Sequence, residues 1–210
     1  MKNIKCIFFD IGYTLINEDD VWQQRCLEQS QTEECRLLSL SPEQIYNEIV
    51  QASLEYKPQY RTVIKKFGFT TPAPYRHNLE KLYDNVDLIL EILANKYTLG
   101  IIANQTDGLT DRLQELGISK YFSHIISSWD YNIMKPDTKL FEIAVNNSGY
   151  KASEIVMVGD RLDNDIFPAK KIGMRTIWIK QGFGGIQIPK SDEYIPDIEI
   201  SELNNLLDIL

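Results

Sequence analysis

The sequence has few cysteines, few histidines and no long hydrophobic run. Its three cysteines, Cys6, Cys26 and Cys35, are odd in number and match no metal-ligand spacing. Neither His77 nor His124 has a metal-binding partner at a useful spacing. We interpret the cysteines as small apolar side chains of a strand and of helices. This pattern predicts a reduced, cytoplasmic protein.

Basic residues are also scarce relative to acidic ones. Lysine and arginine total 22 against 30 aspartates and glutamates, which gives a formal net charge of −8 at pH 7. No cluster of basic residues is dense enough to override that total, so we expect no nucleic-acid partner. An anionic small molecule is compatible with this charge if a metal and a lysine locally invert the potential.

The absence of long apolar runs argues against a membrane protein. The first predicted strand follows the N-terminal methionine closely and is too short for a signal-peptide core or a membrane span. The chain has 210 residues, 43% hydrophobic and 25% charged, which fits one well-filled core and a small accessory domain. No feature of the sequence specifies an oligomeric state.

What is present is an alternation of strand and helix patterns. Five short β-branched or aromatic runs predict buried strands at Ile4–Phe9, Thr98–Ala103, His124–Ser127, Ile155–Val158 and Thr176–Ile179. Helical stripes follow over 109–116, ending at Gly117, and over 140–145, capped by Asp137 and ended by Gly149. The alternation predicts an α/β fold, with a Rossmann-like central parallel sheet flanked by helices.

The first interval between strands is far longer than the roughly 30 residues of one βαβ unit. We therefore predict a small α-helical domain over 18–83, inserted into a core made of 1–17 and 84–210. Helices are expected around Val21–Leu38, Pro42–Leu54, Gln59–Phe67 and, as the crossover to the second core strand, Val86–Lys96. Ser41 is the expected N-cap of the helix that begins at Pro42. The insertion is expected to lie as a lid over the carboxyl ends of the sheet.

Acidic residues follow two of the predicted strands. Asp10 comes directly after Ile7-Phe8-Phe9, and Asp160 follows the run that begins at Ile155, with Asp165 five positions later. Open α/β sheets bind ligands at the carboxyl ends of their strands. Two carboxylates that meet there can share a divalent cation, and one of them can attack a phosphoryl group. The sequence therefore predicts that Asp10 and Asp160 converge.

Four segments in this order resemble the motifs of the haloacid dehalogenase-like (HAD) hydrolases. They are Asp10-Ile11-Gly12-Tyr13-Thr14, Ile101-Ile102-Ala103-Asn104, Lys135-Pro136-Asp137, and Gly159-Asp160 with Asp165. The resemblance covers the predicted core, and the helical insertion resembles the C1-type cap of that superfamily without carrying a diagnostic motif. It implies a Mg²⁺-dependent phosphatase that acts on a small phosphorylated metabolite through an aspartyl-phosphate.

The resemblance also implies the nucleophile and the metal ligands. Asp10 would attack phosphorus with one oxygen and bind Mg²⁺ with the other. Asp160 and the backbone carbonyl of Gly12 would complete the protein's ligands. Asp165 would either bind a metal-coordinated water or orient Lys135, and the sequence leaves both roles open.

Phosphate binding is the remaining implication of the resemblance. Lys135 would neutralise the phosphate and hold the nucleophile in place. The Asn104 amide and the backbone N–H groups of Gln105 and Thr106 would bind the phosphoryl oxygens.

Two positions depart from the family pattern. Gly12 stands where most of these phosphatases have an aspartate that serves as general acid and then base, and losing such a group typically costs roughly 10²–10⁴ in rate. Ala103 replaces a serine or threonine that usually contacts the phosphoryl group. The neighbouring Tyr13 is expected to point elsewhere. A catalytically weak phosphate- and metal-binding protein is therefore an alternative, and a dehalogenase is a third one that the presence of Asp160 argues against.

Overall fold

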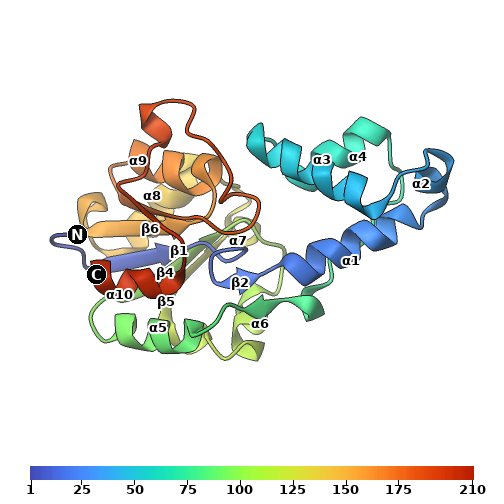
Figure 1. The fold of residues 1–210 in the computed structure, drawn as a ribbon. Coiled ribbons are helices and arrows are strands. Elements are labelled where there is room, and N and C mark those ends of the chain that lie inside the picture. Colours follow the sequence, from blue (N-terminus) through green and yellow to red (C-terminus); the bar gives the residue numbers. More distant parts are fainter.

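The computed structural model describes residues 1–210, whose core is a parallel sheet between two layers of helices (Figure 1). The strands are β1 Cys6–Phe9, β2 Ile16–Asn17, β3 Lys81–Leu82, β4 Thr98–Ala103, β5 Phe122–Ser127, β6 Ile155–Gly159, β7 Arg175–Ile179 and β8 Ile198–Ile200. The α-helices are α1 Asp19–Ser30, α2 Glu33–Leu37, α3 Pro42–Leu54, α4 Gln59–Phe67, α5 Val86–Ala94, α6 Leu109–Glu115, α7 Ser128–Tyr131, α8 Thr138–Ser148, α9 Phe167–Lys171 and α10 Leu206–Ile209. None of them is long and apolar enough to span a membrane.

The central sheet has six strands in the order β5-β4-β1-β6-β7-β8, and every neighbouring pair is parallel. Side chains alternate across it, as the strand period requires. Ile7 and Phe9 of β1 pack with α5, α6 and α10 on one face, whereas Cys6 and Phe8 pack with α8 and α9 on the other. The predicted Rossmann-like α/β sheet is confirmed.

The point where the chain changes direction across the sheet lies between β1 and β6. These strands are neighbours, yet the chain leaves β1 towards α5 on one face and leaves β6 towards α9 on the opposite face. A crevice opens at such a switch point, outside the carboxyl ends of the strands. Asp10 and Asp160 directly follow these two strands, so the topology brings them to the same crevice.

All five predicted core strands are present, while β8 at the sheet edge and the short pair β2 and β3 were not predicted. Asp137 and Gly149 cap α8 as expected, and Ser41 forms a reciprocal capping box with Gln44 at the start of α3. The single helix expected over Val21–Leu38 is wrong. It is two helices, because the Thr32 hydroxyl accepts a hydrogen bond from the Cys35 N–H and starts a second helix.

Helices α1 to α4 lie together beyond the ends to which the core strands point (Figure 1). They provide most of an apolar cluster, which includes Cys26, Ile45, Ile49 and Val63. Two chain segments connect them to the sheet, and these pair with each other as the antiparallel strands β2 and β3.

The loop after β7 makes a further connection between these helices and the core. Phe183 packs into the helical cluster, and its carbonyl accepts a hydrogen bond from the Ser53 hydroxyl of α3 at 2.9 Å. The Gln187 amide group donates to the Ser53 carbonyl at 2.9 Å and to Asp163 at 3.0 Å, while its oxygen accepts from the Leu162 N–H at 2.8 Å. One buried side chain therefore joins α3 to the turn that follows β6.

Candidate active site

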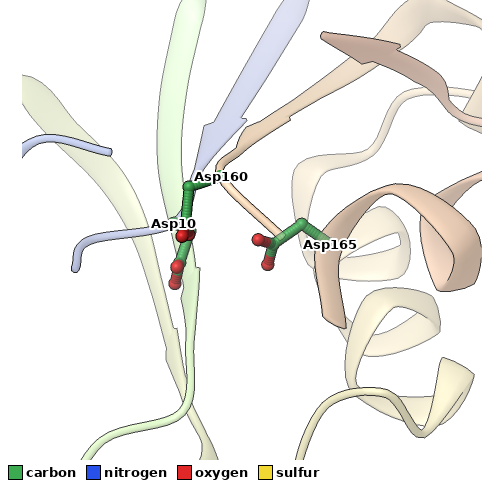
Figure 2. Close-up of side chains that lie close together, drawn as sticks. All are labelled: Asp10, Asp160 and Asp165. Carbon is green, nitrogen blue, oxygen red and sulfur yellow. The ribbon is translucent and has the colours of Figure 1, made fainter. Parts of the chain in front are cut away.

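Three carboxylates meet at the switch point of the sheet (Figure 2). Asp10 follows β1, Asp160 follows β6, and Asp165 belongs to the helical turn Leu162–Ile166 that precedes α9. One carboxylate oxygen from each residue lies within 4.8 Å of the other two. Asp160 and Asp165 are buried and Asp10 is partly buried. The predicted convergence of Asp10 and Asp160 is thus present.

Lys135 lies between two of these carboxylates. Its Nζ donates to Asp10 Oδ1 at 2.7 Å, to Asp165 Oδ1 at 2.6 Å and to the Ile102 carbonyl at 3.1 Å. These three acceptors use all three protons of the ammonium group. The other oxygen of Asp165 accepts the Arg161 N–H at 3.0 Å. Asp165 therefore fixes Lys135, and Lys135 fixes one oxygen of Asp10.

Burial and charge act against each other in this cluster. Burial lowers the pKa of Lys135, but the negative charges of Asp10 and Asp165 outweigh it and raise the pKa above its ordinary value. Burial raises the pKa of Asp165 to about 6, against the lowering effect of Lys135. Burial, reinforced by the charges of Asp165 and Asp10, raises the pKa of Asp160 well above its usual range. The cluster has more negative charge than one lysine neutralises.

The donor set fits a hard divalent cation. The Asp160 carboxylate accepts no hydrogen bond from the protein, although its backbone carbonyl accepts one from Trp178 Nε1 at 2.5 Å. A buried carboxylate without a partner, beside two others, has oxygens available for a cation. Asp10, Asp160 and Asp165 are the residues that could hold such an ion, and Gly12 follows two positions after Asp10.

Asn104 and Gln105, which were expected to bind phosphate, lie in the loop after β4, where both already have hydrogen-bond partners within the protein. The Asn104 amide donates to the Lys135 carbonyl at 3.0 Å and accepts the Lys135 N–H at 2.7 Å, so it holds the segment that carries this lysine. The Gln105 N–H donates to Ser128 Oγ at 3.0 Å, and the Gln105 side chain accepts a hydrogen bond from Arg112. Ser128 was not predicted, although it follows β5 as the other site residues follow their strands.

A cavity of about 810 Å³ separates this loop from α1. Its wall combines residues at the start of α1, of the segment before β3, of the loop after β4, and of α7 and the loop that follows it. They are Glu18, Trp22, Arg25, Tyr75, His77, Asn104, Gln105, Thr106, Ser128, Trp129, Asn132 and Met134. The cavity therefore lies between the inserted helices and the carboxyl ends of the strands, and its size suits a small metabolite.

Glu18 is a site residue that the sequence did not predict. It is 9% exposed, and its carboxylate lies beside Gly12, where a Cβ atom would be 2.5 Å from Glu18 Oε1. Burial raises the pKa of Glu18 to about 7, although hydrogen bonds from Tyr75 and Trp22 lower it. The glycine at position 12 was the only available signal, because a missing side chain leaves room for another one.

Tyr13 points away from the carboxylates, as expected. Its ring is 5.3 Å from the ring of Phe183, within the apolar cluster of the inserted helices. A Cβ atom at Gly182 would lie 2.0 Å from the Tyr13 ring, so this ring packs directly against the Gly182 backbone.

Known proteins share this arrangement of sequence and fold. Residues 7–179 match the family described as haloacid dehalogenase-like hydrolase. The chain is 28% identical over 229 residues to a glyceraldehyde 3-phosphate phosphatase of Methanopyrus kandleri, covering 99% of this chain and 97% of that protein. A glyceraldehyde 3-phosphate phosphatase of Methanocaldococcus jannaschii is 38% identical over 141 residues, covering 65% of this chain and 56% of that protein. The crystal structure of a HAD phosphatase from Thermococcus onnurineus has a TM-score of 0.69 at 26% identity, covering 98% of this chain and 97% of its own.

Proposed function

The chain belongs to the haloacid dehalogenase-like hydrolases, and on this basis we propose that it is a phosphatase that hydrolyses a small phosphorylated metabolite through an aspartyl-phosphate on Asp10. The observation that carries the proposal is the position of Asp10 at the switch point, with one oxygen held by Lys135 at 2.7 Å and with Asp160 beside it. The relatives named above act on a small phosphate ester, which supports the same substrate class here.

In the first step, an oxygen of Asp10 attacks phosphorus, a new O–P bond forms and the bond to the leaving oxygen breaks. Lys135 holds the nucleophile in place, and its positive charge offsets the charge of the phosphoryl oxygens. Asp165 orients Lys135, since its two oxygens accept hydrogen bonds from that ammonium group and from the Arg161 N–H. In the second step, water attacks phosphorus, phosphate leaves and Asp10 is regenerated.

We propose Mg²⁺ as the cofactor, held by Asp10, Asp160 and the Gly12 carbonyl. The buried and unpartnered carboxylate of Asp160 supports this assignment. When bound, the ion supplies positive charge that neutralises the carboxylates and polarises the phosphoryl group.

We further propose that residues 18–83 form a cap domain on the core 1–17 and 84–210. The apolar cluster formed mainly by α1 to α4 and the cavity beneath α1 support this division. A cap excludes water and selects the substrate. Three buried, unpaired cysteines support a reducing, cytoplasmic location, and the acidic net charge supports a small anionic substrate rather than a nucleic acid.

A panel of small phosphate monoesters, including glyceraldehyde 3-phosphate, tests the proposal with and without Mg²⁺. We expect phosphate release that requires the metal and that Asp10→Asn abolishes. The matched control is Asp20→Asn, which removes an exposed carboxylate paired with Lys81 and should keep full activity. Turnover that persists in Asp10→Asn, or no metal-dependent turnover on any ester, would refute the proposal.

A weakly catalytic phosphate-binding protein is the second candidate, and Gly12 favours it because the usual acid is missing at that position. Tight binding of a phosphate-like metal fluoride without turnover of any ester would select this candidate over the phosphatase.

A further inference from the structure

The Glu18 carboxylate fills the space of a side chain that position 12 lacks. A Cβ atom built on Gly12 would lie 2.5 Å from Glu18 Oε1, 2.9 Å from Cδ and 3.3 Å from Oε2. Gly12 is two residues after Asp10, the proposed nucleophile. Glu18 follows β2 and immediately precedes α1, so the inserted helices bring its carboxyl group to this place.

Two hydrogen bonds hold that carboxyl group. Oε2 accepts from Trp22 Nε1 at 2.9 Å, and Oε1 accepts from the Tyr75 hydroxyl at 2.7 Å. No lysine or arginine forms a salt bridge with Glu18, although it is only 9% exposed. The two hydrogen bonds offset part of the cost of burying this carboxyl group, but no opposite charge offsets the rest. Glu18 is also the only acidic residue that lines the cavity of about 810 Å³.

Hydrolysis of an alkyl phosphate requires a proton for the leaving oxygen, because an alkoxide is a poor leaving group. The other nearby groups either have a charged partner or point elsewhere. Asp165 forms a salt bridge with Lys135, His77 Nδ1 is 2.9 Å from Glu80, and Tyr13 points into the apolar cluster. Glu18 is the one carboxyl group of the cavity wall, and it has no charged partner.

From this geometry we infer that Glu18 is the general acid and base of the reaction, in place of a side chain at position 12. The inference rests on the proposed phosphatase function. As Asp10 attacks phosphorus, the Glu18 carboxyl group gives its proton to the leaving oxygen, and an alcohol departs. Glu18, now ionised, then takes a proton from the water that attacks the aspartyl-phosphate. Phosphate leaves, and Asp10 and protonated Glu18 are restored.

The first experiment compares two esters in Glu18→Gln, which keeps the size of the side chain. The esters are an alkyl phosphate that the wild type hydrolyses and para-nitrophenyl phosphate, whose leaving group needs no proton. We expect kcat/KM to fall by roughly 10²–10⁴ for the alkyl ester and by less than about tenfold for the aryl ester. Because the second step also loses its base, the variant should release a burst of about one nitrophenolate per enzyme.

The second experiment moves the carboxylate to position 12. Glu18→Ser opens the space that a side chain there needs, and Gly12→Asp added to it supplies a carboxyl group from the other side. We expect the double variant to hydrolyse the alkyl ester at least tenfold faster than Glu18→Ser alone, whereas Gly12→Asp alone should clash with Glu18. Asp20→Asn, an exposed carboxylate two residues away, should not change the ratio between the two esters.

The outcomes separate the inference from the function on which it rests. Two results would overturn only the role of Glu18 and leave the phosphatase function standing. One is an equal loss of kcat/KM on both esters in Glu18→Gln without a burst, and the other is no gain in alkyl ester hydrolysis in the double variant. If the wild type hydrolyses no alkyl or aryl phosphate ester, the phosphatase function is refuted, and the role of Glu18 is refuted with it. Circular dichroism of each variant verifies that the fold is intact.

Discussion

Replacing Lys135 with methionine perturbs the charge balance of the site most directly. The ammonium group donates to Asp10 at 2.7 Å, to Asp165 at 2.6 Å and to the Ile102 carbonyl at 3.1 Å, and its side chain is 2% exposed. Methionine keeps the apolar stem but removes the cation. Since removing one partner of a buried ion pair costs about 3–5 kcal/mol, we expect the free energy of unfolding to fall by that amount at pH 7.5 without divalent metal. For a chain of this size the midpoint of thermal unfolding should fall by roughly 6–20 °C.

The destabilisation should shrink as the pH falls. Burial raises the pKa of Asp165 to about 6 even beside Lys135, and loss of the lysine raises it further. A carboxyl group whose pKa is raised in the folded state favours folding at low pH, and this advantage is lost as the pH rises through the raised pKa. At pH 5 the carboxyl group is protonated and is no longer an uncompensated buried charge. The free energy of unfolding of Lys135→Met should therefore be closer to that of the wild type at pH 5 than at pH 7.5.

Urea denaturation at both pH values, with chelator present, measures these differences. Lys171→Met is the matched control, because Lys171 Nζ is 2.6 Å from Glu193 but the two side chains are 46% and 57% exposed. The control should change stability by less than about 1 kcal/mol. The electrostatic reasoning would be refuted if Lys135→Met lost no more stability than the control, or if its loss of stability were equal at the two pH values.

Other features of the structure lead to three further predictions. Mg²⁺ at 100 times its dissociation constant should stabilise the wild type against unfolding by about 2.7 kcal/mol, and Asp160→Asn should lose most of this stabilisation. Thermal unfolding with Mg²⁺ and with chelator measures the difference, and equal shifts of the unfolding midpoint in both proteins would exclude Asp160 as a ligand. Burial raises the pKa of Cys6 to about 12 and that of Cys26 to about 11, so a thiol reagent at pH 8 should react with these two cysteines only after unfolding. Fast reaction of the native protein would contradict their burial. Gly100→Ala should lower the free energy of unfolding, measured by urea denaturation, by about 1–3 kcal/mol, because the new Cβ atom would lie 2.4 Å from the Phe8 ring. An unchanged denaturation midpoint would show that this ring moves freely.

The sequence was sufficient to predict the sheet and the meeting of its carboxylates. Asp10 and Asp160 each follow a continuous apolar strand, and parallel strands of one sheet end at the same edge. Their convergence therefore depends on strand pattern and topology, which are both readable from the chain. Lys135 was predicted as a site residue only through family resemblance, because nothing in the nearby sequence indicates that its ammonium group reaches two carboxylates.

Other elements depend on contacts that no local pattern records. The position of Glu18 beside Gly12 is set by the direction in which α1 leaves the β2 strand, and by Tyr75, which is distant in sequence. The edge strand β8 has only three residues, too few for a clear period. Thr32 divides the predicted first helix because its side chain competes for a backbone N–H, an effect that apolar periodicity does not reveal.

The side-chain amide of Gln187 connects helix α3 to the turn that carries Asp165. It bonds both to the Ser53 carbonyl of α3 and to the Leu162 N–H in the turn that carries Asp165. Pulling α3 away from the sheet leaves buried polar groups without partners, at about 1–3 kcal/mol for each. The position of α3 and the position of the turn that carries Asp165 therefore depend on the same buried side chain.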